Sequence, residues 1–218
     1  MAHLLAVFDL DGTLVDGYSQ RYLLGFLRRE GYIGIFRYAV IWLWFVAYSA
    51  RIVDSPARIL RYALDAFIGM KEKDVGAIFD RFFSEELRPR IYPGAAGLIE
   101  GYKRKGYEAV ILSAAIDPIV ARCADHLGAD RYTATELVFV DGALADVKDP
   151  VYGGAKARWL ERERSRSPEG GLRTAAFADH YSDRELLSMA DEPHAVNPDR
   201  RLERYALSRA WPVMSMTP

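Results

Sequence analysis

The stretch Ala6-Val7-Phe8-Asp9-Leu10-Asp11-Gly12-Thr13-Leu14-Val15 organises this chain of 218 residues. The preceding residues from Leu4 onward continue its apolar start, a pattern typical of a parallel strand that is buried on both faces. We therefore expect a strand that ends on Asp9, with Asp11 two residues further on. In open α/β sheets, ligands bind beyond the carboxyl ends of the strands. The two carboxylates are thus predicted to lie at the functional edge of a sheet.

Two carboxylates at such an edge are costly unless they bind a cation or take part in proton chemistry. Asp9 can serve as a nucleophile or metal ligand, and Asp11 as a general acid/base. Gly12 permits a tight turn, and we expect the backbone N–H groups at Gly12 and Thr13 to be free for an anion. A short Asp-x-Asp in a loop is more often a solvated turn, but the preceding strand and the following Gly-Thr favour a functional site.

Composition limits the classes of function. The net charge of -1 argues against nucleic acid or an anionic membrane as the main partner. Cys123 is the single cysteine, which excludes an intrachain disulfide and a thiolate metal cluster, and we expect it to be a small buried side chain on a helix. The start Met-Ala-His-Leu-Leu lacks the basic segment and cleavage site of a signal peptide, so a cytoplasmic protein is expected.

Residues 16–90 predict about four helices and no strand. Ser19 can cap a helix that runs to about Arg29, Ser55-Pro56 is a helix start, and a further helix is expected from Asp74 to about Leu87. Because these helices interrupt a strand-forming chain, they predict an inserted helical cap. The catalytic core would then comprise residues 1–15 and 91–218.

The segment Tyr38 to Tyr48 is apolar or aromatic at every position. As a helix, eleven residues rise only about 16 Å, roughly half of a ~30 Å hydrocarbon core, so a membrane-spanning helix is not expected. Three interpretations remain: a buried cap helix, the wall of an apolar substrate pocket, or an interfacial membrane anchor. Trp42 and Trp44 would lie on different faces of this helix, about 200° apart at 3.6 residues per turn.

The remainder of the chain alternates strand and helix signals. Apolar strands are predicted at Tyr107–Leu112, Tyr132–Val140, Thr174–Ala178 and, as the last strand, His194–Val196, with a hairpin turn at Asp141-Gly142. Helices are expected to follow these strands. The alternation predicts an α/β fold, a Rossmann-like parallel sheet flanked by helices with right-handed crossovers.

Further polar residues are expected at the same edge as Asp9. Ser113 ends a predicted strand, where its hydroxyl and the following N–H of Ala114 can donate to a phosphate oxygen. Lys156 lies at a Gly-Gly-Ala-Lys helix start, and Asp179 ends a strand with Asp183 four residues later. Taken singly, the serine suggests a turn, the lysine a surface residue, and Asp183 a favourable charge at a helix N-terminus.

Together, Asp-x-Asp-Gly-Thr, strand-Ser, Lys and strand-Asp-x-x-x-Asp resemble the four motifs of the haloacid dehalogenase-like superfamily in their order. The helical insert after the first motif is similar to the phosphoserine-phosphatase-like branch. Two late stretches, residues 181–187 and 195–198, and the earlier residues 87–94 resemble an uncharacterised hydrolase subgroup of that branch, the subfamily IB-type hydrolases.

The resemblance implies a Mg²⁺-dependent phosphatase that forms a phosphoaspartate on Asp9, with Asp11 as general acid/base. It implies metal binding by Asp9, Asp11, Asp179 and Asp183, and phosphate binding by Gly12, Thr13, Ser113, Ala114 and Lys156. A dehalogenase is disfavoured by Asp11, whereas a phosphomutase and a catalytically silent phosphate-binding protein remain as alternatives.

Two departures from the family pattern concern the substrate. His180 stands in the fourth motif where a small residue is usual, and we expect it to be an ordinary exposed or core histidine. The stretch Asp16-Gly17-Tyr18-Ser19-Gln20 lacks the acidic residue that reads the amine of phosphoserine, unless Asp16 replaces it. A small phosphorylated metabolite is therefore expected. The alternative is a lipid phosphate of the lysophosphatidate or phosphatidylglycerophosphate type, and the candidate cap contacts are Tyr18, Trp42, Trp44 and Phe45.

Overall fold

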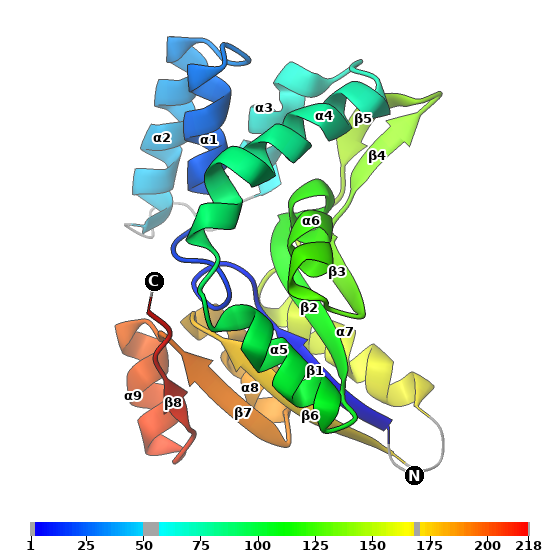
Figure 1. Ribbon diagram of the computed structural model, residues 1–218. Coiled ribbons are helices and arrows are strands. Elements are labelled where there is room, and N and C mark those ends of the chain that lie inside the picture. Colours follow the sequence, from blue (N-terminus) through cyan, green and yellow to red (C-terminus); the bar gives the residue numbers. More distant parts are fainter. Residues whose placement is uncertain (1–2, 50–56, 168–170, 218) are drawn as a thin grey trace.

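A parallel sheet of six strands forms the centre of the computed structural model, which describes residues 3–49, 57–167 and 171–217 (Figure 1). The strand order is β3-β2-β1-β6-β7-β8, and β4 and β5 form a separate antiparallel pair. The strands are β1 (His3–Phe8), β2 (Glu108–Ile116), β3 (Arg131–Thr135), β4 (Leu137–Val140), β5 (Ala143–Val147), β6 (Leu172–Ala178), β7 (Glu192–Val196) and β8 (Val213–Met214). The predicted α/β fold with a parallel sheet is confirmed.

Nine α-helices accompany these strands in the described part of the chain. They are α1 (Ser19–Arg29), α2 (Ile35–Ser49), α3 (Ala57–Leu64), α4 (Glu72–Phe82), α5 (Ala95–Arg104), α6 (Asp117–Leu127), α7 (Gly154–Arg166), α8 (Arg184–Met189) and α9 (Arg200–Ser208). A π-helical turn, Phe83–Leu87, and a 3₁₀ turn, Arg88–Arg90, follow α4. The predicted start Ser55-Pro56 lies outside the described residues.

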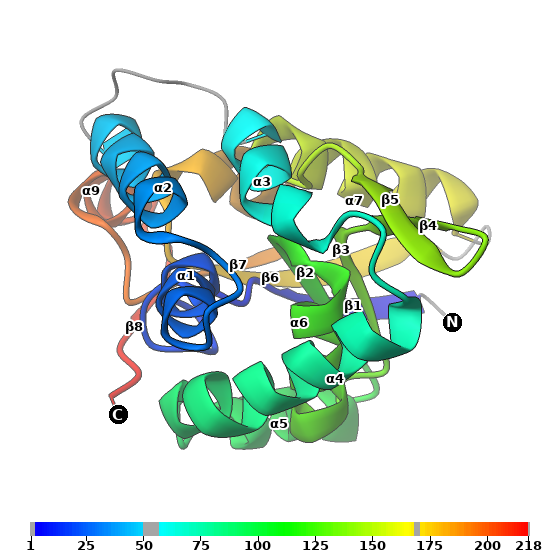
Figure 2. The same ribbon diagram turned by 90° about the horizontal axis from the view of Figure 1, so that it is seen from above.

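Both faces of the sheet are covered, as Figure 2 shows from above. Successive side chains of β1 point to opposite faces. Ala6 and Phe8 belong to the apolar cluster with α5 and α6, whereas Leu5 and Val7 belong to the cluster with α7, α8 and α9. This burial on both sides explains why the strand is apolar from Leu4 to Phe8. Cys123 lies fully buried in the first cluster, as expected.

The residues between β1 and α5 form helices α1 to α4 above the sheet (Figure 1). Two connections lead into and out of this insert, and they run side by side. Val15 and Ile91 form an antiparallel bridge, the amide of Asp16 donates to the carbonyl of Arg90 at 2.8 Å, and the amide of Tyr92 donates to that of Leu14 at 2.9 Å. The insert is therefore attached to the sheet by a paired two-stranded connection.

The β4–β5 hairpin turns at Asp141 and Gly142, as predicted, and both residues have positive φ, which a two-residue type I′ turn requires. Although the hairpin belongs to the second half of the chain, it bonds to the insert. The amide of Gly69 donates to the carbonyl of Leu144 at 2.8 Å, and the amide of Leu144 donates to that of Met70 at 2.9 Å. The hairpin thus supports the insert from the side (Figure 1).

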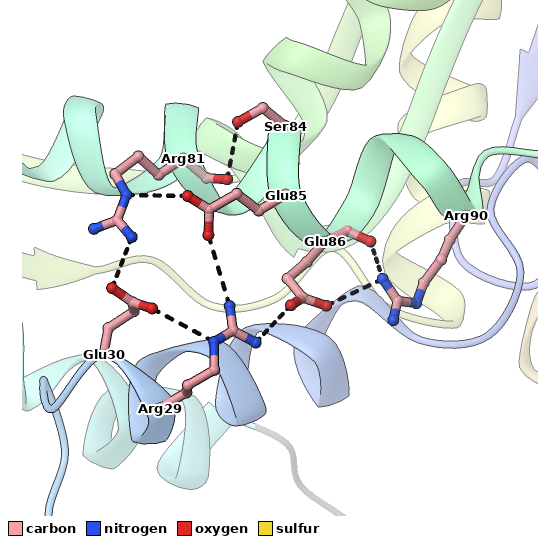
Figure 3. Close-up of polar contacts among 7 residues, drawn as sticks. All are labelled: Arg29, Glu30, Arg81, Ser84, Glu85, Glu86 and Arg90. Atoms are coloured by element: carbon pink, nitrogen blue, oxygen red, sulfur yellow. Dashed lines mark hydrogen bonds and ion pairs between the residues drawn. The ribbon is translucent and has the colours of Figure 1, made fainter.

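Arginine and glutamate side chains join α1 to the end of α4 on the surface (Figure 3). The guanidinium of Arg29 contacts Glu86 at 2.6 Å and Glu85 at 3.7 Å, and that of Arg81 contacts Glu30 at 2.7 Å. The network extends to Arg90, whose guanidinium contacts the Glu86 carboxylate at 3.1 Å. The insert therefore has ion pairs on its outer side in addition to its apolar core.

The aromatic helix α2 is not buried all round, which corrects the first interpretation of that segment. Ile41 is buried, and Tyr38 and Trp44 pack against the core, but Trp42 is 50% exposed and Phe36 is 86% exposed. The expected difference between the two tryptophans is thus observed. The side chain of Phe45 lies outside what the structure describes.

Four strand and helix predictions need correction. The segment Tyr132–Val140, expected as one strand, is divided at Glu136 between β3 of the six-stranded sheet and β4 of the hairpin. Strand β2 continues past Ser113 to Ile116, and its pairing with β3 shifts register between Leu112 and Ile116. His194–Val196 is not the last strand, because Val213–Met214 adds a sixth strand at the edge. The helix expected from Asp74 to Leu87 begins earlier and ends in the π-helical turn.

Candidate active site

Asp9, Ser113 and Asp179 come from three neighbouring strands and reach the same edge of the sheet. Phe8 in β1 lies opposite Ile111 in β2 and Phe177 in β6, so the three polar residues follow at similar heights. The amide of Asp9 donates to the carbonyl of Phe177 at 2.9 Å, which continues the ladder to the end of the strand. The sequence predicted this edge correctly, although Ser113 lies within β2 rather than at its end.

Lys156 lies inside the site and not on the surface. Its ammonium contacts Asp9 Oδ1 and Asp183 Oδ2, each at 2.7 Å, and its side chain is only 3% exposed. The lysine belongs to the first turn of α7, which begins after Gly153. Gly153 has a φ of 53° and a ψ of -122°, a conformation that favours glycine. The sharp turn there brings the lysine to the strand ends.

Asp183 precedes α8 and is buried. One of its oxygens contacts Lys156, and the other accepts a long hydrogen bond of 3.4 Å from the Ser182 hydroxyl. The predicted role of Asp183 as a direct metal ligand has no support in these contacts. The carboxylate instead holds the lysine between itself and Asp9.

Both oxygens of Asp11 are bound by Ser19 at the start of α1. Oδ1 accepts from the Ser19 amide at 2.8 Å, and Oδ2 accepts from its hydroxyl at 2.9 Å. Ser19 was expected to cap the helix itself, but it is the first residue of α1, and Asp11 supplies the acceptor from eight residues upstream. A carboxylate is favourable at a helix N-terminus. The contact couples the insert directly to the first motif.

Burial and mutual repulsion raise the pKa values of the carboxyl groups. The pKa of Asp9 rises from 3.8 to about 6, mainly because burial disfavours the charge, while Lys156 lowers it and Asp183 raises it. Burial raises the pKa of Asp11 to about 7, against the opposing hydrogen bonds from Ser19. The pKa of Asp179 lies well above its usual value through burial and then the charges of Asp9 and Asp183.

The ammonium of Lys156 stays charged despite its burial. Burial lowers its pKa, but Asp183 and Asp9 outweigh that effect, and the pKa lies above its ordinary value. One buried cation therefore stands among four buried carboxyl groups, Asp9, Asp11, Asp179 and Asp183. The site therefore has an excess of acceptors, and the raised pKa values of Asp9, Asp11 and Asp179 are typical of functional sites.

The turn after Asp11 differs from the expectation in its hydrogen bonds. The amide of Gly12 donates to the carbonyls of Val15 and Gly17, at 2.9 and 3.0 Å, and the amide of Thr13 donates to that of Leu10 at 3.3 Å. These two amides are thus engaged and are not free for an anion. Within the described part of the chain, the amide of Asp11 has no hydrogen bond, so it is the better donor of this loop.

Gly12 is nevertheless required at its position. It has a φ of 74°, and a Cβ atom there would lie 2.1 Å from Asp179 Oδ2. The carboxylate of the fourth motif thus packs directly over the backbone of the first. The Oγ1 atom of Thr13 is buried without a hydrogen-bond partner among the described residues. Burial of an unpaired polar atom costs free energy and is unusual in a folded protein.

Ser113 is oriented for donation. Its oxygen accepts from the amide of Ala115 at 3.1 Å, which leaves the hydroxyl proton to point elsewhere. The next peptide is fixed by Thr135, whose hydroxyl donates to the carbonyl of Ala114 at 2.8 Å. Thr135 was missed from the sequence because nothing in the β3 pattern distinguishes it from other buried strand residues.

Tyr18 is the predicted cap contact that lies near these acids. Burial and the charges of Asp179, Asp11, Asp199 and Asp9 raise its pKa to about 12, although its side chain is 51% exposed. Trp42 points instead to the outer side of α2. Asp16 accepts a 3.3 Å hydrogen bond from the Tyr92 hydroxyl. Tyr18 therefore shares the rim of the site with its carboxylates.

His180 has a local role, in line with the expectation of an ordinary histidine. Its Nδ1 accepts from the amide of Ser182 at 3.2 Å and so caps the 3₁₀ turn before α8. Its Nε2 lies 3.4 Å from Asp199 Oδ2. The Asp199 carboxylate caps α9 through the amides of Arg201 and Leu202. This histidine therefore stabilises the loop that carries Asp179.

Two carboxylates at this edge of the sheet, those of Asp9 and Asp179, could bind a magnesium ion. Among the residues that the structure describes, no cluster of three His, Cys, Asp or Glu side chains can hold a metal. The carboxylates of Asp11 and Asp183 are engaged by Ser19 and Lys156, so the four carboxylates do not form a ready cluster, and their predicted binding of a metal stays a prediction. Mg²⁺ commonly uses one or two carboxylates, several waters and substrate phosphate. Asp9 and Asp179 meet that requirement.

Comparison with known proteins shows which proteins the chain is similar to. The model of the family described as haloacid dehalogenase-like hydrolase matches residues 6–188. A Streptomyces azureus protein named for inhibition of morphological differentiation is 33% identical, over 96% of this chain and 77% of its own length. A probable phosphatase of Mycobacterium tuberculosis is 29% identical, over 99% of this chain and 76% of its own.

Solved structures share the fold. A protein of unknown function from Bordetella pertussis has a TM-score of 0.87 at 21% identity, with 98% of this chain and 99% of that chain covered. A phosphoserine phosphatase, solved as a phospho-aspartyl intermediate analogue, has a TM-score of 0.67 at 21% identity, with 100% and 95% covered. The fold of this chain therefore recurs in known structures.

Proposed function

Because this chain belongs to the haloacid dehalogenase-like hydrolase family, we propose that it is a magnesium-dependent phosphomonoesterase that works through a phosphoaspartate on Asp9. Its phosphatase activity follows from the family and from the relatives named phosphatases. The observation that carries the finer proposal is the buried contact of Lys156 with Asp9 Oδ1 at 2.7 Å. A nucleophilic carboxylate must be held rigidly, and its partner must be a cation that also attracts phosphate.

Asp9 attacks the phosphorus in line, the new bond forms to its carboxylate oxygen, and the bond from phosphorus to the ester oxygen breaks. Asp11 gives its proton to the leaving alkoxide. With a pKa near 7, it holds that proton at neutral pH. It then takes a proton from water, which attacks the phosphoaspartate and releases phosphate and free Asp9. The mechanism thus needs Asp9 to be ionised and Asp11 to be protonated.

The remaining groups act on the phosphate oxygens. The Ser113 hydroxyl and the amide of Asp11 are the available donors, and Lys156 supplies a positive charge. Asp9, Asp179 and the carbonyl of Asp11 would hold the magnesium ion, which supplies charge neutralisation for the phosphate when it is bound. Asp183 keeps Lys156 in place. The insert would close over the site and contact the leaving group.

We propose a small phosphorylated metabolite as substrate. Phosphoserine is disfavoured, because Asp16 turns to Tyr92 and the neighbouring Tyr18 is neutral where an acid would read the amine. A lipid phosphate is the second candidate. It is favoured by the exposed apolar side chains of α2, among them Phe36, Trp42 and Leu43.

Hydrolysis of p-nitrophenyl phosphate with and without Mg²⁺ tests the proposal. We expect turnover with Mg²⁺, none after exhaustive chelation, and inhibition by Ca²⁺. Ca²⁺ prefers more ligands at ~2.3–2.6 Å than Mg²⁺ at ~2.0–2.1 Å and can engage both oxygens of Asp9. Full activity in the presence of a chelator would contradict the role of the cation, and no activity under any condition would favour a silent phosphate-binding protein.

A further inference from the structure

Helix α2 carries its exposed side chains on one continuous arc. At 100° per residue, the positions of Ile35, Phe36, Ala39, Val40, Trp42, Leu43 and Val46 span roughly 160° of the helix circumference. All seven are exposed, and none is polar. We call these seven residues the outer arc. A surface helix normally presents polar residues on this side.

The opposite side of α2 accounts for its attachment to the protein. Ile41 is buried, and Tyr38 and Trp44 pack against the core. Arg37 contacts Asp65 at 3.0 Å, and its guanidinium lies over the ring of Tyr62. The helix is thus held by its inner face, while the residues of the outer arc stay exposed. An exposed apolar area of this kind marks an interaction surface.

The charges of α1 and α2 favour an anionic partner. Residues 19–49 contain four arginines and one acid, Glu30, within a chain of net charge -1. Arg29 and Arg37 are paired, but Arg21 and Arg28, both exposed on the neighbouring α1, have no ion pair among the residues that the structure describes. Figures 1 and 2 both show α1 and α2 side by side. The helix pair therefore combines an apolar surface with unpaired cations.

We infer that α1 and α2 form a docking surface for an anionic lipid bilayer, with the outer arc of α2 lying in the interface. No described helix is long and apolar enough to cross a membrane. The fifteen residues of α2 rise about 22 Å, against a hydrocarbon core of ~30 Å. Apolar rings inserted at the interface and basic groups facing anionic headgroups are typical of helices that lie on a membrane.

A second copy of the chain is a weaker occupant of this surface. A symmetric dimer through the outer arc would bring the same unpaired arginines of both copies to one interface, and like charges there oppose association. A bilayer with anionic lipids pairs with them instead. The inference concerns binding alone and does not depend on the phosphatase mechanism.

Vesicle flotation of the full chain tests the inference, with vesicles of phosphatidylcholine alone or with phosphatidylglycerol added. We expect the wild type to float only with the anionic vesicles. Leu43→Ser should weaken binding about tenfold, since it removes a large apolar side chain from the membrane interface. Leu207→Ser is the matched control, because Leu207 on α9 is 65% exposed and Leu43 is 66% exposed. Its binding should stay within twofold of wild type.

Charge-neutralising substitutions and added salt separate the electrostatic from the apolar contribution to vesicle binding. Arg21→Gln and Arg28→Gln should each weaken binding about fivefold, since a basic group near the surface contributes ~1 kcal/mol, and added salt should remove that difference. Circular dichroism should show that all variants are folded, as all four sites are exposed. Absence of flotation, equal loss in Leu43→Ser and Leu207→Ser, or a wild-type dimer that Leu43→Ser dissociates would overturn the inference.

Discussion

This molecule has two groups of ion pairs, one buried in the site and one exposed on the surface. They differ in how strongly each charge depends on its partners. In the site, Lys156 stands between Asp9 and Asp183 with its side chain 3% exposed. On the surface, Arg29 stands among Glu30, Glu85 and Glu86 with its side chain 51% exposed (Figure 3). Water and salt screen the second group, and exposed pairs contribute little. The first group is removed from solvent, so each charge there depends on its partners.

The difference in burial indicates which of the two regions is the functional site. Counting ion pairs would favour the surface network, which has more members. Burial identifies the site, since it raises the pKa of Asp9 to about 6 and that of Asp11 to about 7. Surface carboxylates such as Glu30 move the opposite way, because its arginine partners lower its pKa. A carboxyl pKa raised by burial therefore distinguishes the site from the surface network better than the number of ion pairs does.

Neutralising one carboxylate in each region should give the largest contrast. We expect Asp9→Asn to lower turnover of p-nitrophenyl phosphate at least ~10⁴-fold, because the amide is a poor nucleophile of nearly the same shape. Glu86→Gln, in the surface network, should retain wild-type turnover. Steady-state kinetics of the two purified variants measure this. Turnover by Asp9→Asn near the wild-type rate would remove Asp9 from the mechanism.

Removing the central cation of the site should destabilise the protein. Lys156→Ala leaves Asp9 and Asp183 buried without their shared partner, which costs about 3–5 kcal/mol of unfolding free energy. Urea unfolding at pH 8, above the pKa of about 6 for Asp9, measures this loss of stability. Phosphate affinity and rate should also fall, and Lys156→Arg should recover only part of them, because a planar fork replaces a compact ammonium. Wild-type stability and kinetics in the alanine variant would place Lys156 outside the mechanism.

The stability of the metal-free protein should fall as the pH rises. Folding raises the pKa of Asp11 from 3.8 to about 7, so the folded state keeps a proton that the unfolded chain releases above pH ~4. The associated stability is present below pH ~4 and lost as the pH passes 7, a change of about 4 kcal/mol from Asp11 alone. Unfolding in EDTA at several pH values measures it, and Asp11→Asn should flatten the curve. A wild-type curve that is already flat would contradict the assigned burial effect.

The smallest effect is expected from the surface network. Arg29→Gln breaks the contacts with Glu30, Glu85 and Glu86 but leaves α1 packed through its buried residues, among them Phe26. Its thermal unfolding midpoint should match that of the wild type in 0.5 M salt, where exposed pairs are screened. A clear loss of stability at that salt concentration would show that the network has a structural role beyond exposed ion pairing.

The sequence predicted the parts of the site that strand ends determine. Asp9 and Asp179 each follow an apolar strand, and parallel strands deliver such residues to one edge. Lys156 was identified by its order among the motifs. Contacts across loops were not predictable: the bond between Asp11 and Ser19 depends on how the intervening turn closes, and a serine at a helix start gives no sign of its acceptor.

Two other features needed the structure. The hydrogen bonds of the Gly12 and Thr13 amides depend on the carbonyl positions in the turn, which residue types do not specify. The apolar run from Tyr38 to Tyr48 in α2 was evident, but its periodicity could not divide such a run into inner and outer faces. Packing of Ile41 against the core fixed that division. The extent of the predicted cap, residues 16–90, stays a proposal.

Trapping the covalent intermediate tests most directly whether Asp9 is the nucleophile. The enzyme is mixed with Mg²⁺ and p-nitrophenyl phosphate, quenched during turnover with borohydride, which reduces an acyl phosphate to an alcohol, and analysed by peptide mass spectrometry. We predict that Asp9, and not Asp11 or Asp179, is converted to homoserine, and that omission of substrate abolishes the conversion. Active enzyme with unmodified Asp9, or with the modification on another carboxylate, would contradict it.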